Sequence, residues 1–296
     1  ISNTIVEPIT KSYIDNSTLF NLYSSPENLF RTVAPSSYSS PLNHFGNSCV
    51  LFDCSRIDEV FLAVQQKRAN YGVVPVENST EGGVNNTQDC LIDSTVSIVG
   101  EVIVPIIHHL LVPPGTAEVN ITKIMSHKQS LAQCRQWISK SFPGVELVEC
   151  ASNAEASKLA SESDTTAAIA GSLAAEVYGL EILRDRVQDQ HHNSTRFLVL
   201  SNSTKSPSGS YKTSALIYAE NKPGALFRIL EPFDNLRVNL TKIETRPAKI
   251  EAWAYVFFID FEGHVEDDII VELFKRLEAC TAEIKILGSY PIFVNV

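Results

Sequence analysis

Short apolar runs alternate with segments of helical periodicity from about Phe30 onward. Tyr71–Val76 reads as a buried strand, and Glu59–Arg68 carries Val60 and Val64 on one helical face. A chain with this alternation buries its apolar side chains most readily as a sheet with helices on its faces. The sequence therefore predicts an α/β fold for the larger part of the chain.

The predicted strand Val96–Ile107 is unusually long and suits a chain that crosses from one lobe into another. The elements predicted after it are three strands, Ile121–Ser126, Val145–Cys150 and Ala167–Ala170, each followed by a helix, Lys128–Phe142, Asn153–Ser163 and Ser172–Tyr178. Arg196–Leu200 is predicted to return to the first lobe. Two lobes with a ligand crevice between them follow from this order. The predicted lobes are residues about 30–103 with 190–200, and 104–189.

Beyond a polar linker at residues 201–212, the segment 213–296 predicts strand, helix, strand, strand, helix, strand. That order is the βαββαβ ferredoxin-like pattern of an α+β domain. Residues 1–29 form an N-terminal extension to which the sequence assigns no role.

The chain is acidic, with 24 Lys and Arg against 34 Asp and Glu among 296 residues and a formal charge of −10. This balance argues against nucleic acid and membrane partners, while a small anionic substrate stays compatible with it. The 6 cysteines lack CxxC spacing, and the N-terminus lacks a secretion signal. We therefore expect a cytoplasmic protein with reduced thiols.

In the first lobe, polar residues gather at strand ends. Glu77, Asn78 and Ser79 follow a buried strand, and Thr195 opens another after an acceptor-rich run. A threonine hydroxyl is a poor acid, so a catalytic use requires it to donate a hydrogen bond to a leaving oxygen. A capping turn and a hydroxyl bonded to backbone are the plain alternatives.

In the second lobe, Ser126, His127 and Ser130 lie where a strand passes into a helix, with Gln129 and Gln133 on one helical face. Such a junction can bind a carboxylate. A serine cap beside a surface histidine is the plain alternative.

Other chemistries have little support in the sequence. His108 and His109, with His127, His191 and His192, show no metal-ligand spacing on one element. Neither a Gly-x-Ser-x-Gly turn nor a glycine-rich phosphate loop is present.

With these segments in view, the chain resembles the prephenate dehydratase family over nearly all of its length after about Val33. The matching blocks are Tyr71-Gly-Val-Val-Pro-Val-Glu-Asn-Ser79, Glu81-Gly82, His127-x-Gln129-x-Leu-Ala-Gln133-Cys134, Thr195-Arg-Phe197, Gly224-Ala-Leu226, Glu244-Thr-Arg-Pro247 and Trp253-x-Tyr-x-Phe-Phe-Ile-Asp260.

The resemblance implies a two-lobed, periplasmic-binding-protein-like catalytic domain and a C-terminal ACT regulatory domain. It implies conversion of prephenate to phenylpyruvate in phenylalanine biosynthesis, without a metal or organic cofactor. Thr195, Asn78 and Ser79 would be catalytic. The residues that would contact the substrate are Ser37, Glu77, Ser126, His127, Gln129, Ser130, Gln133, Arg196 and Phe197.

The same resemblance implies feedback inhibition by phenylalanine, bound between the subunits of a homodimer or homotetramer. The residues implied for this allosteric site are Asn221, Pro223, Gly224, Ala225, Leu226, Glu244, Thr245 and Arg246. Taken alone, Glu244 and Arg246 could also be a surface ion pair.

The chain departs from the family pattern at Pro35–Ser39, where the usual glycines are missing, so we expect a reshaped loop around Ser37. It also has Lys128 where proline is usual. The short segment before the catalytic block predicts an enzyme without a chorismate mutase domain. Two alternatives remain open: an arogenate dehydratase, and a non-catalytic amino-acid sensor with the same fold.

Overall fold

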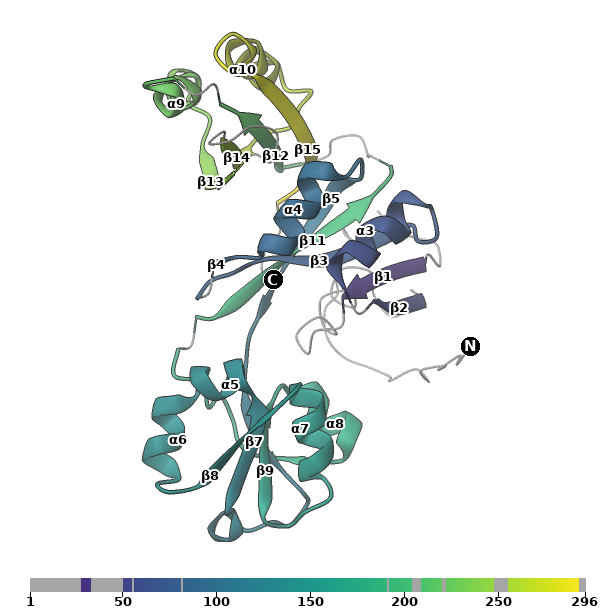
Figure 1. The fold of residues 1–296 in the computed structure, drawn as a ribbon, viewed down its shortest axis with the longest axis vertical. Coiled ribbons are helices and arrows are strands. Elements are labelled where there is room, and N and C mark those ends of the chain that lie inside the picture. Colours follow the sequence, from purple (N-terminus) through teal and green to yellow (C-terminus); the bar gives the residue numbers. More distant parts are fainter. Residues whose placement is uncertain are drawn as a thin grey trace.

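The computed structural model describes residues 28–32, 50–54, 56–80, 82–190, 192–203, 209–219, 222–247 and 255–292. These residues form three sheets with their helices, arranged one after another along the longest axis of the molecule (Figure 1). The predicted α/β fold with a C-terminal βαββαβ module is confirmed.

The first sheet contains the first and last strands of the two-lobed part of the chain. Its strand order is β2-β1-β3-β11-β5, with β4 paired to β3. Helices α3 and α4 pack on it, and Val60, Val64, Leu91 and Leu198 belong to the buried core that forms there. The elements are β1 (Asn28–Thr32), β2 (Val50–Cys54), α3 (Ile57–Gln65), β3 (Tyr71–Asn78), β4 (Gly82–Gly83), α4 (Asn85–Asp93), β5 (Ser97–Pro105) and β11 (Ser194–Ser201).

The chain leaves the first sheet through β5 and returns to it through β11, as the long apolar segment predicts. These two strands are antiparallel neighbours, and at their ends the amide of Ile106 donates to the carbonyl of Asn193 at 2.8 Å. Two adjacent crossing segments therefore connect the lobes (Figure 1).

The second sheet has the order β10-β6-β9-β7-β8. Its elements are β6 (His109–Val112), the short helix η3 (Glu118–Asn120), β7 (Lys123–His127), α5 (Lys128–Gln133), α6 (Arg135–Ser141), β8 (Glu146–Cys150), α7 (Asn153–Ala160), β9 (Thr166–Ala170), α8 (Ser172–Tyr178) and β10 (Glu181–Arg184). Strands β6 and β10 extend the predicted set of three strands.

One continuous helix over Lys128–Phe142 is a wrong prediction, because the helix breaks at Cys134 into α5 and α6. The carboxylate of Asp189 accepts from the amides of Gln136 and Trp137, both at 2.9 Å, and so caps a new helix start. The periodicity of residues 128–142 gives no sign of this cap, because Asp189 lies far along the chain.

The C-terminal module is a sheet of order β13-β14-β12-β15. It comprises β12 (Tyr211–Tyr218), α9 (Ala225–Asn235), β13 (Leu240–Pro247), β14 (Tyr255–Glu262), α10 (Asp268–Glu278) and β15 (Glu283–Pro291). The helices cover one face, where Ile229, Phe233 and Leu273 pack on Ile217 and Ile259.

The other face of this module packs against the first lobe. Leu216, Phe258 and Leu287 of the module share one buried core with Leu91 and Ile98 of the first lobe. The module is therefore joined to the lobe that carries Asn78 and Thr195 by a continuous apolar contact.

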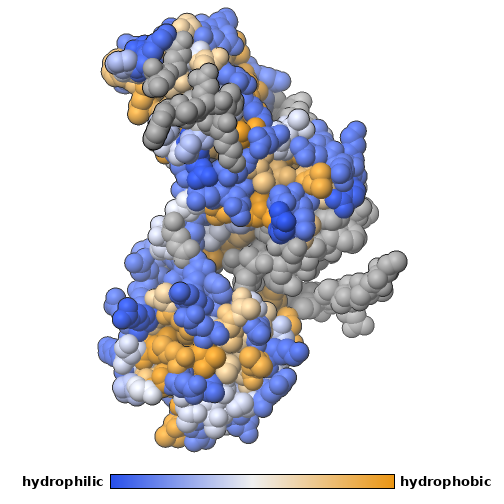
Figure 2. Space-filling view, viewed as in Figure 1, coloured by the Kyte–Doolittle hydropathy of each residue, from blue (hydrophilic) through white to orange (hydrophobic). Residues whose placement is uncertain are grey.

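The face seen in Figure 2 is largely hydrophilic, and apolar side chains gather on part of the second lobe. Among the helices that the structure describes, none combines the length and the apolar character needed to cross a bilayer.

Candidate functional site

Asn78 and Thr195 meet at the end of paired strands β3 and β11. They are register partners, and Asn78 Nδ2 donates to Thr195 Oγ1 at 3.0 Å. The amide of Thr80 donates to Asn78 Oδ1 at 3.0 Å, which identifies the oxygen end of the carboxamide. Because Thr195 Oγ1 accepts this bond with a lone pair, its own O–H can donate elsewhere.

Ser79 and Asn193 hold the two strand ends together around that pair. Ser79 Oγ accepts from the amide of Ser194 at 2.9 Å and reaches the carbonyl of His192 at 3.2 Å. Asn193 is buried, and its Oδ1 accepts from Asn78 Nδ2 at 2.9 Å. The hydroxyl of Ser79 thus bonds to the strand entrance, which favours a supporting role for it.

A second polar cluster lies in the other lobe, where β7 passes into α5. Ser126 Oγ lies 2.8 Å from Asn153 Oδ1, and Asn153 Nδ2 donates to Ser130 Oγ at 2.9 Å. All three residues are buried. The sequence predicted the two serines together, and the structure adds Asn153 as the residue that joins them.

Gln133 is oriented by a histidine from the crossing segment. His108 Nε2 lies 2.8 Å from Gln133 Oε1, which makes the ring nitrogen the donor of this bond. Burial lowers the pKa of His108, although the bond to Gln133 opposes this, so the ring is neutral near pH 7. Gln129 is exposed. Its backbone N–H donates to His127 Nδ1 at 3.3 Å, so His127 caps the start of the helix.

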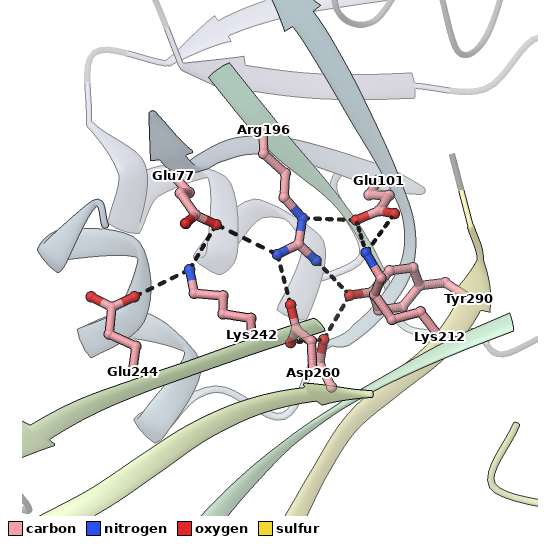
Figure 3. A network of polar contacts seen from close by, with 9 residues as sticks. Glu77, Glu101, Arg196, Lys212, Lys242, Glu244, Asp260 and Tyr290 are labelled. Carbon is pink, nitrogen blue, oxygen red and sulfur yellow. Dashed lines mark hydrogen bonds and ion pairs between the residues drawn. The ribbon is translucent and has the colours of Figure 1, made fainter. Parts of the chain in front are cut away.

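Arg196 is the centre of a buried ionic network between the first lobe and the C-terminal module (Figure 3). Its guanidinium donates to Glu101 at 2.7 Å, to Asp260 at 2.6 Å and to the hydroxyl of Tyr290 at 2.9 Å. Burial alone would lower the pKa of Arg196, but Asp260 and Glu101 hold it above its usual value. The side chain is therefore a permanent cation of this interface.

Glu77 belongs to the same network (Figure 3). It lies 3.0 Å from Lys242 and 3.8 Å from Arg196, and Lys242 also lies 3.1 Å from Glu244. These contacts argue against the predictions that Arg196 and Glu77 bind the substrate. Alternation along β3 and β11 turns both side chains to the opposite sheet face from Asn78 and Thr195.

Phe197 lies two residues beyond Thr195 and is completely buried among apolar side chains that include Val102 and Val199. The ring thus anchors β11 in its sheet. Its contact with a substrate ring stays a prediction.

The residues predicted to bind an amino acid effector divide into two groups. Gly224 directly precedes α9 with φ +76°, a left-handed conformation that glycine adopts without strain, and Leu226 is 41% exposed. Glu244 and Arg246 instead turn towards the first lobe, where Arg246 donates to Asn85 at 2.6 Å and to Asp89 at 2.7 Å. Thr245 lies on the exposed face of β13.

Sequence reasoning missed His108, Asn153 and Asn193 as supporting residues, together with Lys242. The acceptor-rich run before Thr195 pointed to Asn193, whereas Asn153 carried no signal beyond its place at a helix start. Ser37 and Asn221 lie outside the described residues. In the part of the chain that the structure describes, no group of three or more His, Cys, Asp and Glu side chains could hold a metal ion.

Comparison with family models divides the chain in the same way as its fold. Residues 34–205 match the model described as prephenate dehydratase, and residues 213–279 match the ACT domain. The two matches cover the lobes that contain both polar clusters and most of the C-terminal module.

Two curated relatives align with most of the chain. It is 46% identical over 269 residues to a bifunctional chorismate mutase/prephenate dehydratase of Pseudomonas aeruginosa, covering 91% of this chain and 72% of that protein. It is 40% identical over 246 residues to a prephenate dehydratase of Methanocaldococcus jannaschii, covering 81% of this chain and 87% of that protein.

A solved structure shares the arrangement of the lobes. Prephenate dehydratase from Arthrobacter aurescens, crystallised in complex with L-Phe, superposes with a TM-score of 0.78 at 30% identity. The similarity covers 88% of this chain and 89% of that one.

Proposed function

The chain belongs to the prephenate dehydratase family, and we propose which of its residues carry out and regulate that family's reaction. The protein converts prephenate to phenylpyruvate, with loss of carbon dioxide and of the ring hydroxyl, in phenylalanine biosynthesis. Because the product ring is aromatic, the reaction has a large driving force of its own. The enzyme has to orient the substrate and assist the departing oxygen.

Thr195 is the residue that assists the leaving hydroxyl. The hydrogen bond from Asn78 Nδ2 to Thr195 Oγ1 carries this assignment, because it occupies a lone pair and directs the O–H away from Asn78. Asn78 is itself held at both ends of its carboxamide. The donor is therefore oriented before substrate binds, and Ser79 keeps the strand ends in place.

The second lobe supplies the contacts to a substrate carboxylate. Gln133 is supported for this role by its bond to His108, which fixes the plane of its amide. Gln129 is supported by its exposure one helical turn away. Ser126 and Ser130 take part through the rigid cluster that they form with Asn153, with His127 as the helix cap.

Phenylalanine inhibits the enzyme at the ACT domain, and the L-Phe complex of the Arthrobacter relative supports this regulation. For the effector site we propose Pro223, Gly224, Ala225 and Leu226 of one subunit with Glu244, Thr245 and Arg246 of another. The left-handed Gly224 supports it, since the absence of a side chain there lets a ligand approach the backbone.

A homo-oligomer is part of the same proposal. Leu226, Phe227 and Ile243 of the ACT module are 41%, 69% and 45% exposed, which supports self-association through this module. Residues about 30–200 would form the catalytic domain and 213–296 the regulatory domain. A cytoplasmic location is supported by cysteines without disulfide bonds at positions 54, 90, 134, 150 and 280.

A turnover assay with purified protein tests the function. Phenylpyruvate should form from prephenate, and added phenylalanine should slow its formation. Arogenate offered in competition tests the closest alternative, because preference for it would reassign the substrate. No turnover of either substrate would overturn the enzymatic assignment.

A further inference from the structure

Helix α4 lies across the face of the ACT sheet that is not covered by α9 and α10. Its Leu91 packs with Leu216, Phe258 and Leu287 of that sheet. The first lobe thus presents one helix to the regulatory module (Figure 1).

Lys285 of β15 holds the C-terminal end of this helix. Its ammonium donates to the carbonyls of Leu91, Ile92 and Ser94 at 3.0, 2.8 and 2.6 Å. The last turn of α4 contains no basic residue of its own. A cation from the regulatory module therefore bonds to the carbonyls that a helix end leaves unpaired and complements the helix dipole.

Arg246 of β13 holds the other half of α4. It donates to Asn85, the first residue of the helix, and to Asp89, one turn later. Strands β13 and β15 are the two edges of the ACT sheet. The helix is accordingly clamped at both ends by cations from opposite edges of one sheet.

A short path leads from α4 to the predicted catalytic residues. The helix follows β4, whose Gly82 pairs with Asn78 in the register of β3. Thr87 Oγ1 of the helix donates to the carbonyl of Pro75 at 2.5 Å, and the backbone amide of Val84, which directly precedes the helix, donates to the carbonyl of Val76 at 2.8 Å. A shift of α4 along the sheet is thus transmitted to the strand end that carries Asn78.

The contact between α4 and β13 also contains an unsatisfied group. Gln88 is completely buried, and among the residues that the structure describes neither its amide oxygen nor its amide nitrogen has a hydrogen-bond partner. Gln88 Nε2 and Glu244 Oε1 both lie closer than 3.0 Å to the point where a side chain on Gly83 would begin. A small displacement of β13 that brings the Glu244 carboxylate to Gln88 would give the amide nitrogen of Gln88 an acceptor, which favours a second arrangement of this contact.

We propose that α4 couples the effector site to the catalytic side chains, with Lys285 and Arg246 as positioning residues. The inference rests on the proposed function and specifies its regulation. Phenylalanine bound beside Glu244 and Arg246 changes how Arg246 holds α4, while Lys285 keeps the far end of the helix attached. The displacement then reaches Asn78 and its hydrogen bond to Thr195.

The test compares Lys285→Met with Lys275→Met, which changes an exposed lysine on α10, each in the whole 296-residue chain. For each variant, the rate at saturating prephenate is measured without and with saturating phenylalanine, and phenylalanine binding is measured by calorimetry. We expect Lys285→Met to bind phenylalanine while its ratio of uninhibited to inhibited rate falls about fivefold. Lys275→Met should keep the wild-type ratio.

Asp89→Asn is the second variant, because it removes the charged partner of Arg246 from a partly exposed position on α4. It should lower the same ratio even if Lys285→Met fails to fold. Wild-type inhibition in either folded variant would overturn the coupling. A wild-type protein that turns over prephenate but binds no phenylalanine would overturn the effector proposal instead, so the two failures are distinguishable.

Discussion

Arg196 of β11 and Asp260 of β14 lie 2.6 Å apart, across the contact between the first lobe and the ACT module. Arg196 directly follows Thr195, and its register partner Glu77 directly precedes Asn78. One face of the paired strands thus carries the predicted catalytic side chains, while the other face is bonded to the regulatory module. The ACT module is therefore bonded to the strand positions directly next to the predicted catalytic residues Thr195 and Asn78.

Replacing Arg196 by methionine should destabilise the protein strongly. The change would remove the cation bonded to Asp260, whose side chain is 9% exposed, and would leave Glu101, 1% exposed, paired with Lys212. Removing one partner of a buried ion pair costs about 3–5 kcal/mol of unfolding free energy. Urea denaturation measures this loss.

Arg237→Met is the matched control, because Arg237 forms an ion pair with Asp234 while 86% exposed. An exposed pair contributes little, so its loss should change the free energy of unfolding by less than about 1 kcal/mol. Equal effects of the two substitutions would contradict the central position of Arg196 in the network.

Thr195→Val should lower turnover about 10²- to 10³-fold, because valine keeps the β-branched shape and removes the hydroxyl that donates to the leaving oxygen. Thr195→Ser keeps the hydroxyl and should retain most of the activity. Steady-state kinetics with prephenate measures both variants, and circular dichroism checks their folding. If the valine variant turns over substrate at nearly the wild-type rate, Thr195 has no part in the reaction.

Local pattern predicted much of this fold. The bounds of α8 agree with its predicted range, and each element of the ACT module was predicted in order, since alternation and amphipathic periodicity are strong there. Helix α4 was missed, because Asn85–Asp93 is a polar stretch with few apolar positions. Contacts from Lys285 and Arg246, distant in sequence, help to hold it as a helix.

The sequence predicted individual residues of the candidate site, but it did not predict which way their side chains point. Asn78 and Thr195 were singled out separately, and strand pairing brings them together. Arg196 and Glu77 were assigned to the substrate, whereas both side chains bond within the chain to the first lobe and the ACT module. A strand pattern shows which residues share a face, but the partner of each face depends on how the domains pack.

The stability of the protein should depend on the protonation of His108. Burial lowers its pKa in the folded state, so the folded protein binds fewer protons than the unfolded chain below the unfolded pKa of about 6.5. The His108 contribution to the free energy of unfolding should therefore be constant above about pH 7. It should fall as the pH decreases through about 6.5 towards the lowered pKa of His108 in the folded protein.

His108→Gln isolates this contribution, because glutamine can still donate to Gln133 and does not titrate. The pKa of His109 is also lowered by burial, with Asp185 opposing it, but this residue is present in both proteins, so their difference reports His108 together with its repulsion by His109. Urea titrations from pH 8 to pH 5 should show the stability advantage of the wild type shrinking as the pH falls. Parallel curves would exclude His108 as the source.

Gly288 of β15 lies directly against the backbone of β5. A Cβ atom built there would lie 2.9 Å from both the nitrogen and the carbonyl carbon of Ile98. These are backbone atoms of a paired strand, so they cannot move away as the end of a flexible side chain can. Gly288→Ala should therefore separate the ACT module from the first lobe locally and cost about 1–3 kcal/mol or more.

Gly179→Ala is the control for this substitution. Gly179 has a φ of +64° and Gly288 a φ of +153°, but no atom of the described residues lies within 4 Å of a Cβ atom placed on Gly179, so only backbone strain of about 1 kcal/mol is expected there. Hydrogen exchange separates the two effects: Gly288→Ala should increase exchange in both β5 and β15, and Gly179→Ala only near α8. Because β5 pairs with β11 beside Thr195, the alanine at position 288 should also lower turnover. Unchanged exchange in β5 would show that the two strands can part without disturbing the first lobe, contrary to the close backbone contact.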